Sequence, residues 1–234
     1  KMPKKTTNKI SVLIPSRNRT IQLVNSVRQI LSMAADPGRV EILLRLDCDD
    51  EASLRAYRGL RLTVPAVAVV DDRYTGWASN HVFYNALARQ ATGDWLLLYN
   101  DDAQMLTSAW DNRLMAVTKP IAATRMLLEK GSQPHRWKVK QTGQMMGNCF
   151  PAVRRDAYEL LGQFARHRHA DVYWEWLTGP LGLQEPVEID ILHTPTSSVV
   201  PATRGSGWWE DFNTDPLKSL LEQDQQQLKE AFCE

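Results

Sequence analysis

The stretch Ala91–Leu106 reads ATGDWLLLYNDDAQML and decides the fold. Its apolar run, Trp95–Tyr99, has the length of a strand buried in a sheet. The residues Asn100-Asp101-Asp102, which we call the acidic step, follow immediately, and open α/β sheets bind ligands at the carboxyl ends of their strands. Hard divalent cations prefer carboxylate oxygens and are usually shared with substrate phosphates. The stretch therefore predicts a site for a metal ion and a phosphate group.

Length and composition favour one domain without a strongly charged partner. The 234 residues suffice for one large α/β domain and would be cramped as two. A formal net charge of +1 gives no overall attraction to nucleic acid. The three cysteines have no paired spacing, which fits a reducing compartment. No run approaches the ~18 apolar residues of a membrane span and no signal-peptide pattern is seen, so we expect a soluble, cytoplasmic protein. The oligomeric state stays open.

Apolar runs alternate with helical patterns through the first half of the chain. The candidate strands are residues 9–15, 40–46, 64–70 and 95–99. Helical spacing predicts one helix that buries Ile21, Val24, Val27 and Leu31, and a second that begins at Ala78. Such alternation predicts a mostly parallel sheet with right-handed crossovers.

The ends of these strands carry the polar residues. In a parallel sheet the carboxyl ends of the strands share one edge, so Pro15, Asp47, Asp71 and Asp101 should gather there. Together they predict one crevice of nucleotide size.

The second half is less regular. Residues 121–128 are a candidate strand, and the polar segment 129–147 is expected to pass over the site. Short helices are predicted at 154–161 and 171–177, a late strand at 187–192 leads to His193, and the spacing from Leu217 to Phe232 predicts a C-terminal helix.

Five stretches together resemble the GT-A glycosyltransferases, specifically the large family 2-like group that contains many inverting nucleotide-sugar transferases. They are ISVLIPSRNR (10–19), EILLRLDCDD (41–50), GWASNHVFYNALARQATGDWLLLYNDDAQM (76–105), GNCFPAVRRDAYELLGQF (147–164) and HADVYWEWL (169–177). The resemblance implies an α/β GT-A fold: a Rossmann-like, mostly parallel sheet flanked by helices, with a smaller acceptor-side region and a C-terminal helix. It implies a single domain, 1–234. Residues 9–119 would bind the nucleotide sugar, 120–200 would form the acceptor-binding and catalytic half, and 201–234 would form a flexible lid and the C-terminal helix.

The resemblance also implies a divalent cation, Mn²⁺ or Mg²⁺. The family's DxD motif is represented by the acidic step, so Asp102 matches the metal-binding acid and His193 resembles a late histidine that completes the metal shell in some members. A histidine after a strand also fits a surface or hydrogen-bonded core residue. Asn100 replaces the first carboxylate, and an amide supplies no charge, which would weaken metal binding. Adjacent residues of an extended segment point in opposite directions, so Asp101 would contact sugar or backbone instead.

Nucleotide contacts are expected from the first loop and from neighbouring strand ends. Arginine suits bidentate phosphate contacts, which is the favoured interpretation; the alternative is that both loop arginines cap the sheet edge in solvent. The family's second-strand aspartate accepts the uracil imide N–H, which implies Asp47. Asp49, Asp71 and Asp72 are the alternatives. The full set of candidate nucleotide-binding residues is Pro15, Ser16, Arg17, Asn18, Arg19, Asp47, Asp49, Asp71, Asn80, Asn100 and Asp101.

An inverting transfer needs a base within hydrogen-bond reach of the acceptor hydroxyl. The resemblance implies Asp171, because the first acid of the family's pair is replaced by Ala170. Glu175, one helical turn later, is the alternative.

Three further features have open interpretations. The segment Arg204–Trp209 suits a lid or an anchor for the C-terminal helix. The cluster Arg166–His169 suits an anionic ligand or a solvated loop. Trp137, Trp174 and Trp176 suit either the acceptor side or the core.

The leading hypothesis is a metal-dependent, inverting glycosyltransferase that moves a sugar from a UDP-sugar to a hydroxyl of a glycan or small molecule. A nucleotidyltransferase that makes nucleotide sugars is disfavoured because the first loop has no glycine-rich phosphate cradle. A catalytically degenerate binding module is a third class, suggested by Asn100 and Ala170. Modified DNA is a less favoured acceptor given the near-neutral charge, and salt-sensitive binding would reveal it.

Overall fold

The computed structural model describes residues 7–62, 64–73, 76–128, 137–138, 145–146, 150–194 and 216–233. Their strands are β1 (Ile10–Ser16), β2 (Val40–Asp47), β3 (Ala66–Asp71), β4 (Trp95–Leu98), β5 (Ala103–Met105), β6 (Ile121–Leu128), β7 (Trp137–Lys138), β8 (Met145–Met146), β9 (Ala152–Arg154) and β10 (Gln184–His193). Eight of these form one sheet in the order β3-β2-β1-β4-β9-β6-β10-β5, and β7 pairs with β8 separately.

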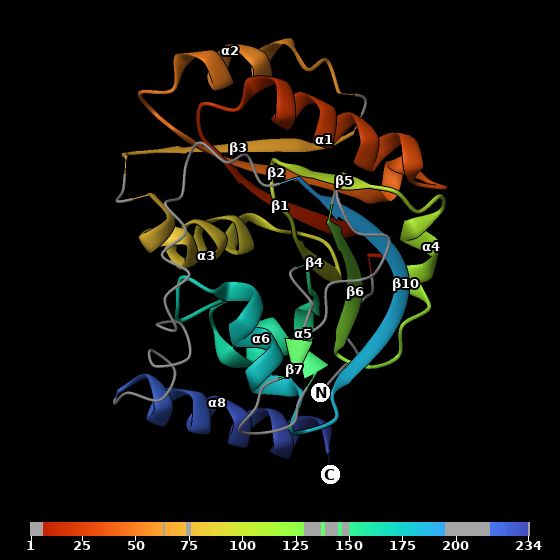
Figure 1. The fold of residues 1–234 in the computed structure, drawn as a ribbon, viewed down its shortest axis with the longest axis vertical. Coiled ribbons are helices and arrows are strands. Elements are labelled where there is room, and N and C mark those ends of the chain that lie inside the picture. The colour runs from red at the N-terminus through yellow and green to blue at the C-terminus, as the bar shows by residue number, and fades with distance from the viewer. Residues whose placement is uncertain are drawn as a thin grey trace.

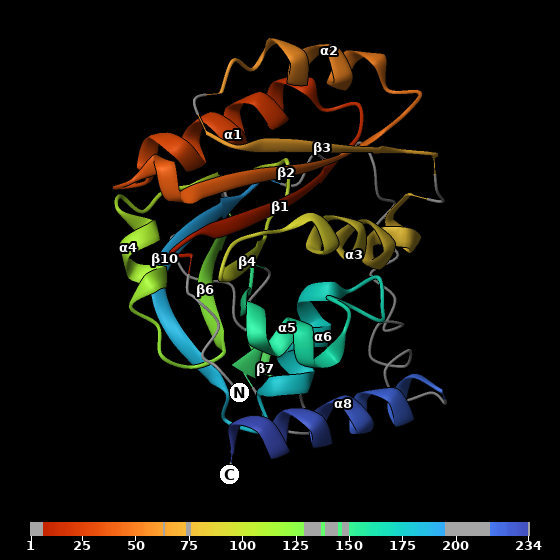
Figure 2. The same cartoon turned by 180° about the vertical axis from the view of Figure 1, so that it is seen from behind.

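Helices cover both faces of this sheet (Figure 1). They are α1 (Thr20–Met33), α2 (Glu51–Gly59), α3 (Asn80–Gln90), α4 (Trp110–Met115), α5 (Arg155–Leu161), α6 (Ala170–Thr178) and α8 (Leu217–Phe232), with short 3₁₀ turns at Pro37–Arg39 and Gly76–Ser79. α1 and α2 lie on one face, whereas α3, α5 and α6 lie on the other, with α8 outside α5 and α6. The reverse view in Figure 2 shows the same layers and the long, curved β10. No helix of the described residues is long and apolar enough to cross a membrane.

The sheet is mostly parallel. β1 pairs in parallel with β2 and β4, β2 with β3, and β6 with β10. β9 is antiparallel to both β4 and β6, and β5 is antiparallel to β10. Consequently β1, β2, β3, β4, β6 and β10 all end at the same edge, and the predicted α/β class with a mostly parallel sheet is confirmed.

The central strands are buried on both faces, which explains their continuous apolar sequences. All eight residues of β2 and all four of β4 are buried. Ile10 lies in register with Val40 on one side and Trp95 on the other. This packing fixes where the strands end and therefore where the polar loops begin.

Most predicted elements are confirmed with shifts of a few residues, and the differences have physical causes. Ile21 does not join the buried face of α1, because its side chain is 73% exposed. Leu23, Val27 and Ile30 form that face instead, and at about 100° per residue Ile21 points away from Leu23. Four strands were missed, β5, β7, β8 and β9, since strands of two or three residues carry almost no periodic signal.

Several sequence predictions fall outside the described residues. These are the lid Arg204–Trp209, Cys149, the Trp137 side chain, and the segment 129–147 apart from the backbone of β7 and β8. The division into three functional parts stays a prediction.

Candidate active site

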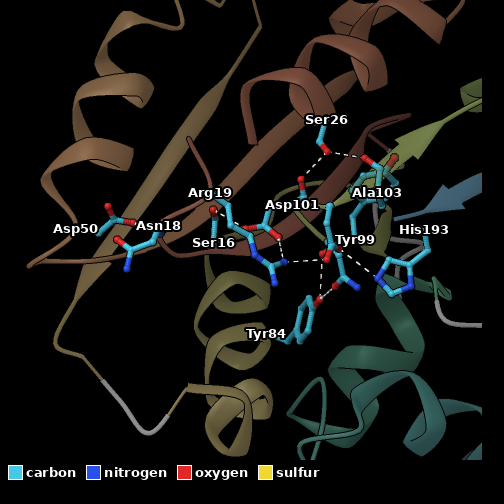
Figure 3. A network of polar contacts seen from close by, with 12 residues as sticks. Ser16, Asn18, Arg19, Ser26, Asp50, Tyr84, Tyr99, Asp101, Ala103 and His193 are labelled. Atoms are coloured by element: carbon cyan, nitrogen blue, oxygen red, sulfur yellow. Dashed lines mark hydrogen bonds and ion pairs between the residues drawn. The ribbon is translucent and has the colours of Figure 1, made fainter. Parts of the chain in front are cut away.

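The acidic step connects β4 to β5, and this crossing brings His193 to Asp102. β5 begins directly after Asp102 and runs antiparallel to β10, with Ala103 in register with His193. The backbone N–H of Thr194 also donates to the Asp102 carbonyl at 3.1 Å. As a result His193 Nε2 lies 3.2 Å from Asp102 Oδ1 (Figure 3). The two residues predicted as metal ligands therefore lie side by side at one edge of the sheet.

Arg19 binds both carboxylates of the acidic step. Its Nη1 donates to Asp101 Oδ1 at 2.9 Å and to Asp102 Oδ2 at 2.8 Å. Ser16, at the end of β1, donates to Asp101 Oδ2 at 2.8 Å. The two aspartate side chains are only 7% exposed and Arg19 is 21% exposed. Both oxygens of Asp101 are thus bonded within the protein, and this residue holds the first loop against the acidic step.

Burial and charge act differently on the two neighbouring acids. Burial raises the pKa of Asp101 above its ordinary value, despite the opposing effects of Arg19 and Ser16. Burial also raises the pKa of Asp102, but the hydrogen bond and charge of His193, together with the charge of Arg19, outweigh it and lower the pKa. Burial lowers the pKa of Arg19, and the two carboxylates more than compensate. Asp102 is therefore the acid held most firmly as a carboxylate.

One helix from each face of the sheet supports the backbone of the acidic step. Ser26 Oγ, on α1, lies 2.9 Å from the Asp101 carbonyl and 2.5 Å from the Ala103 carbonyl. Tyr84 OH, on α3, lies 2.9 Å from both the Tyr99 carbonyl and Asn100 Oδ1. Sequence reasoning missed both residues. Their signal was a hydrogen-bonding group on the buried face of a helix, which needs a partner.

A second cluster forms around Arg17, two residues before Arg19. Arg17 donates to Asp47 Oδ2 at 2.5 Å and to the two oxygens of Asp49 at 2.5 and 3.0 Å. The buried Arg45 contacts the other oxygen of Asp47. The hydrogen bond from Arg17 lowers the pKa of Asp49. The two loop arginines therefore bind different carboxylates. Arg17 binds those at the end of β2, and Arg19 binds those that follow β4.

Asp50 fixes the loop between these two clusters. Its carboxylate caps α2 by accepting from Ser53 N at 3.1 Å, and it accepts from Asn18 N at 2.7 Å. Asn18 has a positive φ of 54°, a conformation that asparagine tolerates better than most residues. Asp50 was not predicted as a site residue, although Asp directly before a helix is a preferred N-cap residue.

Other predicted residues lie at the margin. Pro15 is in register with Arg45, inside the sheet. Asp71 ends β3, one strand beyond Asp47, and its Oδ1 accepts from the next backbone N–H at 2.8 Å. Asn80 Nδ2 donates to the Arg168 carbonyl at 3.2 Å, which ties α3 to the loop before α6.

Asp171 lies in the first turn of α6 and is partly exposed. Burial raises the pKa of Tyr84 well above its ordinary value, and the negative charges of Asp171, Asp101 and Asp102 raise it further. Asp171 is therefore within electrostatic reach of the phenol that supports the acidic step. Glu175 is 6% exposed and so is less accessible than Asp171 to an acceptor.

Two residues near α6 whose role was open from the sequence, Trp174 and Arg166, contribute to packing. Trp174 is fully buried and packs against Phe164, with ring centroids 5.8 Å apart. Arg166 donates to both oxygens of the buried Asp224 at 2.6 and 2.7 Å, and Tyr173 donates to the same carboxylate. This cluster attaches α8 to the domain, and we assign Arg166 and Trp174 to packing.

The pair Asp102 and His193 fits a divalent cation. Two adjacent ligands of an octahedral ion, each roughly 2.1 Å from it, are about 3.0 Å apart, close to the 3.2 Å between these two atoms. Among the described residues no group of three or more His, Cys, Asp or Glu side chains could hold a metal. Mg²⁺ and Mn²⁺ commonly use one or two protein ligands and complete their shell with water and phosphate oxygens, so two suffice.

Comparisons with known proteins support the fold. No protein-family model matches the sequence, and no curated protein sequence is similar to it. Among solved structures, S. aureus TarS 1–349 in complex with UDP is 12% identical with a TM-score of 0.62, covering 97% of this chain and 72% of that one. The same protein with UDP-GlcNAc is 10% identical with a TM-score of 0.62, covering 95% and 73%. The mannosyltransferase PcManGT from Pyrobaculum calidifontis, with GDP-Man and Mn²⁺, is 15% identical with a TM-score of 0.59, covering 86% and 59%.

These similarities confirm the predicted fold. The chain has the GT-A glycosyltransferase fold. At such low identity they leave the activity to be argued from the site itself.

Proposed function

We propose that this protein is a metal-dependent glycosyltransferase that moves a sugar from a nucleoside diphosphate sugar, with UDP as the nucleotide, to a hydroxyl acceptor. The observation that carries the proposal is the Asp102–His193 pair, 3.2 Å apart at the edge where β1, β2 and β4 also end. The similar structures support the donor class, because TarS binds UDP and UDP-GlcNAc and PcManGT binds GDP-Man with Mn²⁺.

The donor would span the two arginine clusters. Asp47 and Asp49 lie at the nucleobase end, and Arg17 holds their carboxylates ready to accept a base N–H. Arg19 and the acidic step lie at the diphosphate end. Ser16 and Asp101 keep this end in place, whereas the amide of Asn100 supplies a neutral polar group for ribose or sugar. Asp71 and Asn80 would contribute at the margin of the nucleotide.

Asp102 and His193 would hold Mn²⁺ or Mg²⁺. When bound, the cation would neutralise charge that develops on the leaving diphosphate. The chain's own contribution is to keep Asp102 ionised, which His193 and Arg19 do by lowering its pKa against the effect of burial. Replacement of a first carboxylate by Asn100 leaves one acid to carry this role.

Asp171 would act as the base of an inverting reaction. It would accept the proton of the acceptor hydroxyl while that oxygen bonds to the anomeric carbon and the bond from this carbon to the diphosphate breaks. Its support is its place in the first turn of α6, with its charge felt at Tyr84 beside the acidic step. A glycan or small-molecule hydroxyl is the proposed acceptor, ahead of modified DNA.

Calorimetric titration tests the proposal. The purified protein would be titrated with UDP- and GDP-sugars, each with and without Mn²⁺, and the Asp102→Ala variant would be the matched control. We expect metal-dependent binding of a UDP-sugar by the parent and its loss in the variant. Absence of donor binding by the folded parent with Mn²⁺ present would contradict the proposal.

A catalytically degenerate binding module is the second candidate, and Asn100 together with Ala170 favours it. Both proposals expect donor binding, so turnover separates them. Release of UDP from a bound donor, abolished by Asp171→Asn, would support the enzyme. Tight donor binding with no release in the presence of varied hydroxyl acceptors would support the module.

A further inference from the structure

Arg19 already occupies the carboxylates to which a metal ion would bind. One nitrogen of its guanidinium lies 2.9 Å from Asp101 Oδ1 and 2.8 Å from Asp102 Oδ2. His193 contacts the opposite oxygen of Asp102. An ion between Asp102 and His193 would therefore share the Asp102 carboxylate with the guanidinium of Arg19, a group that stays positively charged in proteins.

Counting charges shows the consequence. Asp101 and Asp102 carry two negative charges, and Arg19 cancels one of them. A divalent cation without a nucleotide would therefore meet a net charge of only −1 from these three side chains. A nucleoside diphosphate brings negative charge of its own, which favours both the cation and Arg19.

We propose that Arg19 is the resident counter-ion of the acidic step and makes metal binding depend on the nucleoside diphosphate. The inference rests on the proposed function, because it assumes the metal site at Asp102 and His193. In the empty site Arg19 holds the two acids. When diphosphate and metal bind together, the guanidinium transfers its hydrogen bonds from Asp102 to the diphosphate, and the ion takes the carboxylate.

The surroundings of Arg19 allow this exchange at little structural cost. Its backbone is fixed, because the Arg19 carbonyl accepts from Leu23 N at 2.9 Å at the start of α1. Its side chain makes no capping hydrogen bond to that helix and is 21% exposed. After the exchange Asp101 keeps the hydrogen bond from Ser16, and Asp102 would have the ion as its partner in place of Arg19. Neither buried acid is left without a partner.

Arg17 provides a matched control. It lies in the same loop and pairs with two aspartates, yet its partners are Asp47 and Asp49. Arg17→Met and Arg19→Met change the net charge equally and remove the same chemical group. A general effect of net charge on metal affinity would appear in both variants, whereas the proposed effect appears in one.

The experiment measures free Mn²⁺ by electron paramagnetic resonance, with and without UDP. We expect the parent to bind Mn²⁺ weakly alone and more than about tenfold more tightly with UDP. Arg19→Met should bind Mn²⁺ alone about tenfold more tightly than the parent, with a smaller gain from UDP. Arg17→Met should bind Mn²⁺ alone like the parent, and Arg19→Lys should restore the weak binding.

Two outcomes have distinct meanings. Unchanged or weaker Mn²⁺ binding by folded Arg19→Met, or equal tightening by Arg17→Met, would overturn the role of Arg19. An Asp102→Asn variant tests the metal site separately. If it binds Mn²⁺ with UDP as tightly as the parent, the proposed metal site itself is wrong, and the role of Arg19 is refuted with it.

Discussion

The two arginine clusters arise from the same loop between β1 and α1, yet they differ in how far they are buried. Arg17 joins a buried Asp47 to Asp49, whose side chain is 46% exposed. Arg19 joins Asp101 and Asp102, both only 7% exposed. An exposed ion pair contributes little to stability, whereas an acid left buried without its partner costs several kcal/mol. The Arg17 cluster can therefore rearrange around a ligand freely. In the Arg19 cluster, a side chain that loses its partner must gain another one.

This difference in burial separates the residues that could bind a ligand from those that hold the site in place. Asp101 has both oxygens bonded inside the protein, and it positions the acidic step. Asp49 is open to solvent, whereas Asp102 is bonded to Arg19 and would receive a ligand only in exchange for that arginine. The contrast is tested by variants at matched positions in the two clusters.

Changing Asp102 to Asn should have the largest effect on function. Loss of the carboxylate that we propose as the metal ligand should weaken Mn²⁺-dependent donor binding by at least about 100-fold, as measured by calorimetry. The matched Asp47→Asn variant should weaken UDP binding while leaving its metal dependence intact. Equal metal dependence in Asp102→Asn and the parent would remove the distinction between the clusters.

Asp171→Asn tests a residue that belongs to neither cluster. A missing general base slows transfer by about 10²–10⁴-fold, while donor affinity should stay within twofold or so of the parent. Turnover and donor titration measured on one preparation provide the check. Parallel loss of donor affinity would assign Asp171 to binding instead.

Variants of the two clusters should also differ in their free energy of unfolding, by a smaller amount. Asp101→Asn should lower the free energy of unfolding by about 1–3 kcal/mol, because a buried charge-assisted pair is weakened. Asp49→Asn, at the exposed pair, should change it by less than about 1 kcal/mol. Urea unfolding of the two variants gives the comparison, and a larger loss for Asp49→Asn would reverse our ranking of the clusters.

The smallest expected effect is the pH dependence of the stability that Asp50 contributes. Asp50 lies between the two clusters. Burial raises the pKa of Asp50, but hydrogen bonds from Ser53 and Asn18 outweigh it and lower the pKa. A folded pKa below the unfolded one gives stability that is present above about pH 4 and is lost as pH falls through the folded value. Asp50→Ala should therefore cost about 1 kcal/mol at pH 7, and the difference should vanish near pH 2. Persistence of the full difference at low pH would contradict this assignment.

The sequence predicts the first four strands well because their signals are local. Apolar runs and the polar residues that end them correctly predicted β1, β2, β3 and β4 and their common edge. The pairing of Asp102 with His193 is different, since 91 residues separate them in the chain. It came from a family resemblance, and its physical cause, the antiparallel pairing of β5 with β10, depends on a three-residue strand that has no periodic signal.

Long-range polar contacts account for what sequence reasoning missed. Nothing local assigns Arg17 to Asp47 and Arg19 to Asp101, because adjacent loop residues can turn to either strand end. Ser26 and Tyr84 were missed for a related reason, since their partners are backbone carbonyls in a loop far along the chain. Such contacts follow from tertiary packing, and only polar groups on buried helix faces indicate that partners must exist.

The most direct test of the account is anomalous diffraction from crystals grown with Mn²⁺ and UDP. We predict one manganese peak within ligand distance of Asp102 and His193, with UDP phosphate oxygens completing its shell and the Arg19 guanidinium on the diphosphate. A crystal with UDP bound in which manganese lies elsewhere, or in which Arg19 still bridges Asp101 and Asp102 beside the bound ion, would contradict it.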